Sequence, residues 1–346
     1  MSPKNIVVFG AGALGSLVAA YLNRAGHLAT VVDPWYAHMV AIQRDGLHVT
    51  DPDEEFTVRM RALHHDRLRE AAPIDILFLS VKSMDTEQAT RYVAPYLSPD
   101  GFIVSAQNSL NEEIISSIVG PERTIGMAAT RITCAVYEPG VLLRYSSVRD
   151  KVFQVGELDG STTPRLQEVA GLMSNVAGAS ITGDIWGALW TKLAVNCMGN
   201  ALAGLTGQTA TPLASSPIAR RVRMLIGKEV VEVGEAYGIK FGNIGGFPPE
   251  YYKDVDGPGG QAIEKKALED AVRSAGKEEH KPSLLQDVIK RRRSEVDYLN
   301  GLIVRKGEQV GMPAPVNAAT TEAVHRIDTG DLKPDMANLE LFRELV

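Results

Sequence analysis

The sequence predicts an α/β chain in which a doubly wound parallel sheet is followed by an all-α domain. Up to residue 184, short apolar runs that suit buried parallel strands alternate with segments of helical periodicity. After residue 184 the pattern is almost entirely helical. We therefore expect two domains, residues 1–184 and residues 185–346, with an insertion at about residues 241–282 in the second.

The first domain is expected to alternate strands and helices. Strands are predicted at residues 6–9, 29–32, 75–81, 101–106 and 124–130, and helices at residues 16–25, 36–44, 86–97 and 111–118. Further β structure is predicted at residues 46–50, 55–61 and 132–156, before a helix at residues 163–177 and a strand at residues 179–182. Helices of the second domain are predicted at residues 185–205, 218–237, 262–275, 282–311 and 317–329.

A glycine-rich loop with the spacing G-x-G-x-x-G connects the first strand to the first helix, and Asp33 ends the second strand. The loop consists of Gly10, Ala11, Gly12, Ala13, Leu14 and Gly15. In this context Gly10 permits a tight turn, Gly12 lets a pyrophosphate approach, and Gly15 allows close packing of helix and strand. Backbone N–H groups of the helix then face the anion. The order of these features predicts a Rossmann-type, dinucleotide-binding domain.

Asp33 bears on which dinucleotide is bound. A carboxylate at this position accepts hydrogen bonds from the adenosine ribose and repels a 2′-phosphate. No Arg or Lys follows before Arg44, so the sequence favours NAD over NADP. The alternative is that Asp33 and Pro34 merely begin a turn.

Composition excludes several classes of function. The net charge of −6 gives no general affinity for nucleic acid or for an anionic membrane. Cys134 and Cys197 are too few for a disulfide framework, and no metal site is expected. No apolar run reaches membrane-spanning length, and residues 1–4 lead directly into the first strand. We expect a cytoplasmic protein with a small-molecule partner, and the apolar surface of its helices is compatible with a homodimer.

A polar stripe is expected on the first helix of the second domain. Lys192, Asn196 and Asn200 are spaced four apart among mostly apolar residues, so they share one helix face. Burying these groups is costly unless they face a polar ligand or one another. A lysine ammonium can protonate a carbonyl oxygen while hydride reaches the carbon, and partial burial moves its pKa toward the working range. Alternatively, Lys192 extends to solvent and the asparagines bind nearby backbone.

A second group of polar residues lies further along the chain. Ser283 stands where it can cap the helix expected at residues 282–311, and Glu295 follows twelve residues later. On local grounds Ser283 is acceptable as a cap and Glu295 as a surface acid. The basic run from Lys290 to Arg293 is expected to be a solvated helix face.

Along nearly its whole length the sequence resembles the ketopantoate reductase (2-dehydropantoate 2-reductase) family. The residues that carry the resemblance are Gly10 to Gly15, Leu79-Ser80-Val81-Lys82-Ser83, Gln107-Asn108, Leu189-Trp190-Thr191-Lys192-Leu193 with Asn196 and Asn200, and Ser283-Leu284-Leu285-Gln286-Asp287 leading to Glu295 and Asn300-Gly301. The resemblance implies an NAD(P)-dependent oxidoreductase that reduces the 2-keto group of ketopantoate, a step of pantothenate biosynthesis.

The resemblance also implies roles for residues of the second domain. Lys192 would be the general acid, and Glu295 would hold the lysine or the substrate hydroxyl. The substrate's hydroxyl and carboxylate would be bound by Asn196, Asn200 and Ser283. Because ligands of open α/β sheets bind beyond the carboxyl ends of the strands, the chemistry is expected between the two domains.

For the cofactor, the resemblance places Asn108 between nicotinamide and substrate, and Lys82 near the ribose and phosphates. Three features depart from the family's pattern: Ser109 replaces a usual Gly, Asp33 stands where a basic residue is frequent, and the insertion is long. The insertion is interpreted as a lid, a subunit contact or a surface loop. Two alternatives stay open: the same chemistry on a different hydroxy acid, alcohol or ketone, and a non-catalytic dinucleotide-binding protein.

Overall fold

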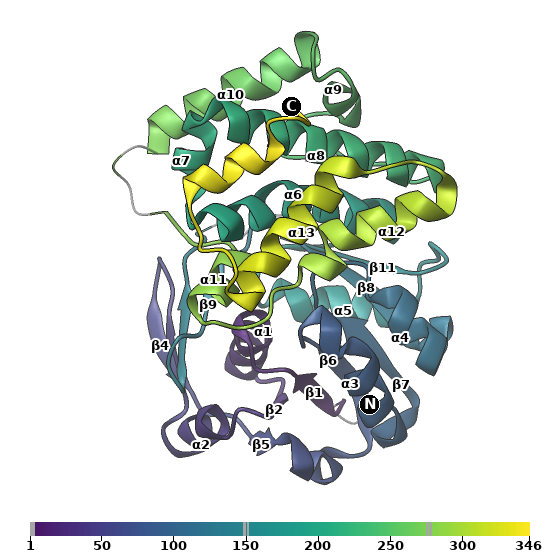
Figure 1. Ribbon diagram of the computed structural model, residues 1–346. Coiled ribbons are helices and arrows are strands. Elements are labelled where there is room, and N and C mark those ends of the chain that lie inside the picture. Colours follow the sequence, from purple (N-terminus) through teal and green to yellow (C-terminus); the bar gives the residue numbers. More distant parts are fainter. Residues whose placement is uncertain (1–3, 148–149, 151, 275, 277–278) are drawn as a thin grey trace. The chain divides into compact units, whose positions relative to one another are not determined.

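The computed structural model describes residues 4–147, 150, 152–274, 276 and 279–346 (Figure 1). The expected lead-in at residues 1–3, part of the β segment at residues 132–156, and the end of the helix expected at residues 262–275 fall outside this set. The chain divides into two compact units, Met1–Leu189 and Trp190–Val346, here called the first and the second unit.

The first unit is built on an eight-stranded sheet with the order β12-β11-β8-β7-β6-β1-β2-β5. Its strands are β1 (Ile6–Phe9), β2 (Thr30–Asp33), β5 (Ala62–His64), β6 (Ile74–Leu79), β7 (Leu97–Ser105), β8 (Thr124–Ala129), β11 (Phe153–Glu157) and β12 (Ala179–Ile181). All neighbouring pairs are parallel except β8 and β11. The sheet confirms the predicted doubly wound class, and it brings the carboxyl ends of β1, β2, β6 and β7 to one edge.

Helices cover both faces of this sheet because alternate strand residues point to opposite sides. Val8 belongs to a core cluster with Leu17, whereas Val7 belongs to another with Ile115. The first cluster packs under α1 (Ala13–Arg24), α2 (Tyr36–Asp45) and α5 (Pro164–Ser174), and the second under α3 (Thr86–Val93) and α4 (Glu112–Val119) (Figure 1). Short 3₁₀ helices in this unit are η1 (His65–Ala71), η2 (Ser83–Asp85), η3 (Ala94–Tyr96) and η4 (Pro121–Arg123).

A separate four-stranded sheet has the order β4-β3-β10-β9. It consists of β3 (Leu47–Thr50), β4 (Glu55–Val58), β9 (Cys134–Ala135) and β10 (Val141–Arg144). The strand predicted at residues 55–61 is therefore too long, because the chain leaves this sheet after Val58. Residues Ala62–His64 instead pair with β2 as an edge strand of the main sheet, which the sequence did not predict.

The second unit is helical, as predicted. Its elements are α6 (Ile185–Thr206, which begins in the first unit), α7 (Ala210–Ser215), α8 (Pro217–Ala236), α9 (Pro249–Lys253), α10 (Pro258–Ser274), α11 (Ser283–Ile289), η5 (Val296–Tyr298), α12 (Asn300–Val310), α13 (Pro315–Thr329) and η6 (Met336–Phe342). The region expected as an insertion contains α9 and α10. An ion pair of 2.8 Å between Arg220 on α8 and Glu264 holds α10 against the rest of the unit.

The single helix predicted at residues 282–311 is wrong, because the chain breaks between Ile289 and Asn300. Arg291 adopts a left-handed φ of 52°, which ends regular helix. Ser294 then binds Asp328 on α13 through both its backbone N–H, at 3.1 Å, and its hydroxyl, at 2.7 Å. The exposed side chains from Arg291 to Arg293 are solvated as expected, but they lie in this break and not on a helix face.

Candidate active site

The glycine loop turns between β1 and α1 with no room for side chains at two of its glycines. Gly10 has a φ of 103°, and a Cβ there would lie 2.6 Å from the backbone of Ser80. At Gly15 a Cβ would lie 1.9 Å from the carbonyl oxygen of Gly10. Gly12 differs from both, because nothing lies within 4 Å of the position where its Cβ would be. It is exposed and stands directly before α1.

The open space at Gly12 fits the pyrophosphate of a dinucleotide. No side chain caps the N-terminus of α1, and its first turn contains no acidic residue. The helix therefore offers its terminal N–H groups and the positive end of its dipole to an anion. The expected loop residues Gly10 to Gly15 form one continuous segment at this position.

Asp33 is bound to the same loop. Its Oδ2 accepts a hydrogen bond of 2.6 Å from the backbone N–H of Ala11, and its Oδ1 accepts one of 2.7 Å from that of Trp35. The hydrogen bond from Trp35 closes a turn at Asp33 and Pro34, which is the alternative role expected for Asp33. Each carboxylate oxygen can accept a further hydrogen bond, so both contacts leave capacity for ribose hydroxyls.

The loops after β6 and β7, which carry Lys82 and Asn108, are tied together. The carbonyl oxygen of Asn108 accepts hydrogen bonds from the Ser83 hydroxyl at 3.3 Å and from the Asn111 carboxamide at 2.5 Å. Gln107 donates to the carbonyl of Val81 at 2.9 Å. Since β6 lies between β1 and β7, these loops adjoin the glycine loop at the carboxyl edge of the sheet.

Ser109 is buried and has a φ of 75°, in the left-handed region. A non-glycine residue in this conformation costs on the order of 1 kcal/mol, whereas glycine adopts it freely. The backbone at this position therefore suits the glycine that the family usually has.

On α6, Asn196 is buried, and Lys192 and Asn200 are partly buried. Burial lowers the pKa of Lys192 to about 8, because removal of water disfavours the ammonium form. A lysine with such a pKa is charged at neutral pH and can still release its proton, which suits a general acid.

Ser283 meets Asn200 because α11 packs closely on α6. A Cβ on Gly204 of α6 would lie 2.0 Å from Cδ2 of Leu284, so the missing side chain makes room for Leu284. The Asn200 carboxamide then donates a hydrogen bond of 3.3 Å to the hydroxyl oxygen of Ser283. Ser283 is the first residue of α11 and caps nothing, so the interpretation as a helix cap is wrong.

Glu295 is 4% exposed and directly precedes η5, so it is no surface acid. Its predicted contact with Lys192 or with substrate stays a prediction. Among the residues that the structure describes, no group of three or more His, Cys, Asp or Glu side chains is placed to bind a metal ion. In the same part of the chain, no helix has both the length and the apolar character needed to cross a membrane.

Three buried polar residues near the site were missed from the sequence. Ser16 donates a hydrogen bond to the carbonyl of Ala11 in the glycine loop, and His38 contacts Ser16. Glu112 begins α4, close to the end of β7. Burial raises the pKa of Glu112 to about 7. None of the three belongs to a recognisable motif. In the sequence, Glu112 is indistinguishable from an ordinary acid at a helix N-terminus. His38 is likewise indistinguishable from a surface residue of a short helix.

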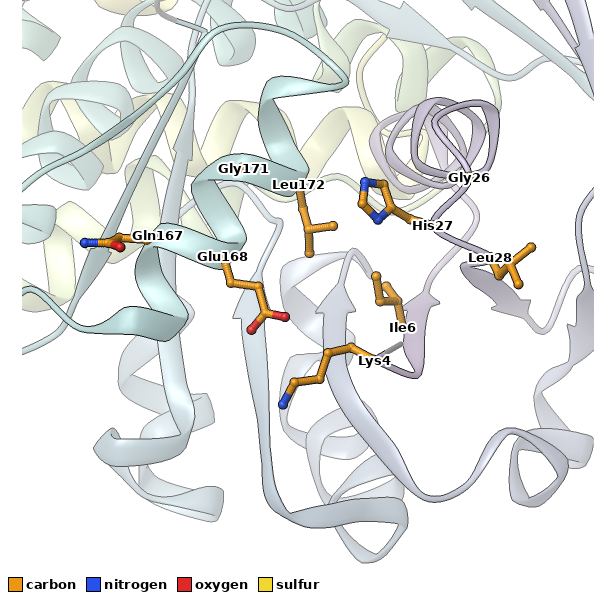
Figure 2. Close-up of a pocket in the computed structure, with 9 residues that line it drawn as sticks. All are labelled: Lys4, Ile6, Gly26, His27, Leu28, Gln167, Glu168, Gly171 and Leu172. Carbon is orange, nitrogen blue, oxygen red and sulfur yellow. The ribbon is translucent and has the colours of Figure 1, made fainter. Parts of the chain in front are cut away.

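A hollow of about 350 Å³ lies at the opposite, amino-terminal edge of the sheet (Figure 2). It is bordered by the start of β1, the connection after α1, and α5, through the residues Lys4, Ile6, Gly26, His27, Leu28, Gln167, Glu168, Gly171 and Leu172. None of the predicted site residues lines it.

Comparison with known proteins gives the following matches. Residues 6–160 match the family model described as ketopantoate reductase PanE/ApbA, and residues 184–328 match the model of its C-terminal region. A 2-dehydropantoate 2-reductase of Mesorhizobium japonicum is 27% identical over 344 residues, which cover 93% of this chain and 97% of that protein.

Two solved structures have the same fold. A PanE/ApbA family ketopantoate reductase from Ralstonia eutropha JMP134 superposes with a TM-score of 0.78 at 24% identity, over 94% of this chain and 98% of that one. A D-mandelate dehydrogenase with bound NADH and anilino(oxo)acetate superposes with a TM-score of 0.77 at 21% identity, over 94% and 98% of the two chains.

Proposed function

Because the chain belongs to the ketopantoate reductase family, we propose that it reduces the 2-keto group of 2-dehydropantoate and uses NADH in preference to NADPH. The chain is an NAD(P)-dependent oxidoreductase that acts on a CH–OH group, and its cofactor is a nicotinamide dinucleotide. The substrate and the choice between the two dinucleotides belong to the proposal.

The observation that supports the substrate most directly is on α6. Lys192, with its lowered pKa, is on the same helix as Asn200, whose carboxamide is hydrogen-bonded to Ser283. A hydroxylated 2-keto acid needs a proton donor for the carbonyl oxygen, together with amide and hydroxyl groups for its other oxygens. This set of side chains offers both kinds of group.

In the proposed mechanism, the reduced nicotinamide supplies hydride to the carbonyl carbon when it is bound. The ammonium of Lys192 donates a proton to the carbonyl oxygen. Asn196, Asn200 and Ser283 hold the hydroxyl and carboxylate of the substrate, and Glu295 holds Lys192 or the substrate hydroxyl. These residues position the substrate and stabilise the charge that develops on oxygen.

The preference for NADH follows from Asp33. Its carboxylate is held by Ala11 and Trp35, so it cannot swing away from the end of β2 without breaking both contacts. A fixed negative charge there repels a 2′-phosphate while it accepts hydrogen bonds from ribose. We propose that Lys82 approaches the ribose and phosphates and that Asn108 lies beside the nicotinamide.

Titration of the protein with NADH and with NADPH, followed by nicotinamide fluorescence, tests the cofactor choice. We expect the wild type to bind NADH more tightly than NADPH. In D33N the ratio of the two Kd values should fall about tenfold, because the amide lacks the charge of the carboxylate but keeps an acceptor oxygen. Turnover of 2-dehydropantoate is then compared with that of benzoylformate and other 2-keto acids. If another 2-keto acid has the higher kcat/KM, that acid and not 2-dehydropantoate is the preferred substrate. The proposed hydride transfer and protonation by Lys192 would be unaffected by this result.

We further propose that the enzyme is cytoplasmic and that the second unit forms a homodimer in which α10 contributes to the contact. Two apolar side chains on one side of α10, Leu268 and Val272, are exposed and one turn apart. Light scattering on the wild type and on L268E/V272E distinguishes a dimer from a monomer, and an unchanged dimer in the variant would exclude α10 from the contact.

A further inference from the structure

Both backbone polar groups of Ala11, in the glycine loop, are held by side chains. Its N–H donates to Oδ2 of Asp33 at 2.6 Å, and its carbonyl oxygen accepts a hydrogen bond of 2.9 Å from the hydroxyl of Ser16. Ser16 is the residue after the last glycine of the loop and is fully buried. The loop conformation is therefore fixed by side chains and does not depend on α1 alone.

The hydroxyl of Ser16 is itself held by His38 on α2. The ring nitrogen Nε2 of His38 lies 3.3 Å from the Ser16 oxygen, and Nδ1 accepts a hydrogen bond of 2.9 Å from the backbone N–H of Gly140. Because Nδ1 is an acceptor, the proton of a neutral ring is on Nε2. The Ser16 oxygen gives its own proton to Ala11, so it accepts the proton of Nε2.

These contacts form a directed relay: Gly140 N–H to His38, His38 to Ser16, and Ser16 to the carbonyl of Ala11. Only the neutral imidazole can accept at one nitrogen and donate at the other. His38 is fully buried, which lowers its pKa, although the charge of Asp33 acts in the opposite direction. Trp35 stacks on the ring with 4.9 Å between centroids and 19° between planes, which fixes its orientation.

The hydrogen bonds from His38 through Ser16 to the Ala11 carbonyl determine the direction of the Gly12 N–H. The peptide between Ala11 and Gly12 is planar and trans, so its carbonyl and its N–H point in opposite directions. When Ser16 holds the Ala11 carbonyl toward α1, the N–H of Gly12 must point away from Ser16. Gly12 is the exposed residue with open space around it, where the loop fits a pyrophosphate.

We propose that His38 is a positioning residue for the dinucleotide: acting through Ser16, it fixes the Ala11–Gly12 peptide so that the N–H of Gly12 is presented to the pyrophosphate. The inference rests on the proposed binding of a dinucleotide by this loop. It adds a positioning element, from α2 and from the turn at Gly140 before β10, that no glycine-loop motif contains.

Two substitutions of His38 separate this role from packing. The amide nitrogen of a glutamine reaches the place of Nε2, so H38Q keeps a donor for Ser16. An asparagine reaches only the place of Nδ1, so H38N keeps the acceptor for Gly140 and loses Ser16. We expect H38N and S16A each to raise the Kd for NADH about tenfold, and H38Q to raise it less than about threefold.

The affinities are measured with NADH, ADP-ribose and AMP by calorimetry on the full chain, with thermal melts to verify folding. AMP lacks the pyrophosphate, so its Kd should change less than about twofold in every variant. The double variant S16A/H38N should lose no more affinity than either single variant, because both remove the same relay. His27, which is exposed in the same unit, supplies the matched control H27N with unchanged Kd values.

Equal NADH affinity in H38N and wild type would overturn the proposal. Equal losses for H38N and H38Q that extend to AMP would also overturn it, because they indicate a general packing role. If H38N does not fold, the comparison of S16A with wild type on NADH and AMP decides the question. A wild-type protein that binds neither NADH nor NADPH would instead remove the proposed function, and this inference with it.

Discussion

The carboxamide nitrogen of Asn200 lies 3.3 Å from the hydroxyl oxygen of Ser283, and this hydrogen bond joins α6 to the start of α11. The two residues belong to separate motifs of the sequence. Their approach depends on Leu284, which occupies the space left by the missing side chain of Gly204. Through Asn200, the hydroxyl of Ser283 thereby joins the polar stripe that carries Lys192.

Removal of the Ser283 hydroxyl is expected to weaken substrate binding more than catalysis. In S283A the Asn200 carboxamide loses its acceptor, and the substrate loses one hydrogen-bonding group. We expect the KM for 2-dehydropantoate to rise about tenfold with less than about a threefold change in kcat, and an unchanged Kd for NADH. The matched control is S215A at an exposed serine of α7. A KM equal to that of the wild type would remove Ser283 from the substrate site.

The lowered pKa of Lys192 gives a prediction for the pH dependence of the reaction. Burial moves this pKa from its ordinary value of 10.5 to about 8, so the ammonium form is lost as the pH rises through 8. Reduction needs the ammonium as proton donor, so its kcat should fall above about pH 8, and the reverse oxidation should rise over the same interval.

The Lys192 variants test this assignment. K192A should lower kcat for reduction by a factor of about 100 or more, and K192R should lose the fall near pH 8 because arginine stays charged. K228R, at a half-exposed lysine of α8, should keep the wild-type profile. Unchanged turnover in K192A would falsify the role of Lys192 as general acid.

The doubly wound sheet and the polar stripe on α6 could be predicted because both depend on the spacing of apolar and polar residues over short stretches of sequence. Val7 and Val8 lie in opposite core clusters, as a strand covered on both faces requires. Lys192, Asn196 and Asn200 share a helix face simply because they are four residues apart.

The features that sequence reasoning missed depend on partners far along the chain. A hydrogen bond from the Ser294 hydroxyl to the Asp328 carboxylate stabilises the break after α11. Strand β5 forms because Ala62–His64 pair with β2 at the edge of the main sheet. The ring of His38 lies between Ser16 and Gly140, and Gly140 is 102 residues away along the chain. Patterns over ten or twenty residues contain no information about such pairs.

The backbone conformation of Ser109 leads to a prediction about stability. Its φ of 75° penalises any residue with a Cβ, and the comparison of S109A with S109G isolates this penalty because both lack the hydroxyl. We expect S109G to have the higher free energy of unfolding by about 1 kcal/mol, measured by urea denaturation. An exposed serine of α4, Ser117, supplies the control pair S117A and S117G, in which alanine should be the more stable by a similar amount. If alanine is the more stable at both positions, no strain is stored at Ser109.

Glu112 should make the stability of the protein fall as the pH rises from about 4.5 to about 7. Its pKa is raised to about 7 chiefly because burial disfavours the charged carboxylate. In this interval the folded state keeps a proton that the unfolded state, with the ordinary value of 4.5, has released. The stabilisation is therefore complete below pH 4.5 and is lost as the pH passes the folded value.

E112Q is neutral at every pH and should remove this dependence. We consider the free energy of unfolding of E112Q minus that of wild type. This difference should be more positive at pH 8 than at pH 4 by roughly 3 kcal/mol, as measured by urea denaturation at both pH values. The next residue on α4, Glu113, is exposed, and E113Q should reproduce the wild-type slope. Glu112 directly follows Asn111, whose carboxamide is hydrogen-bonded to the carbonyl of Asn108, so the ionised form should also loosen the loop that carries Asn108. The Kd for NADH in wild type should then rise with pH between 6 and 8, whereas in E112Q it should stay level. Parallel slopes of E112Q and wild type in both measurements would show that the acid at position 112 is ionised in the folded protein throughout.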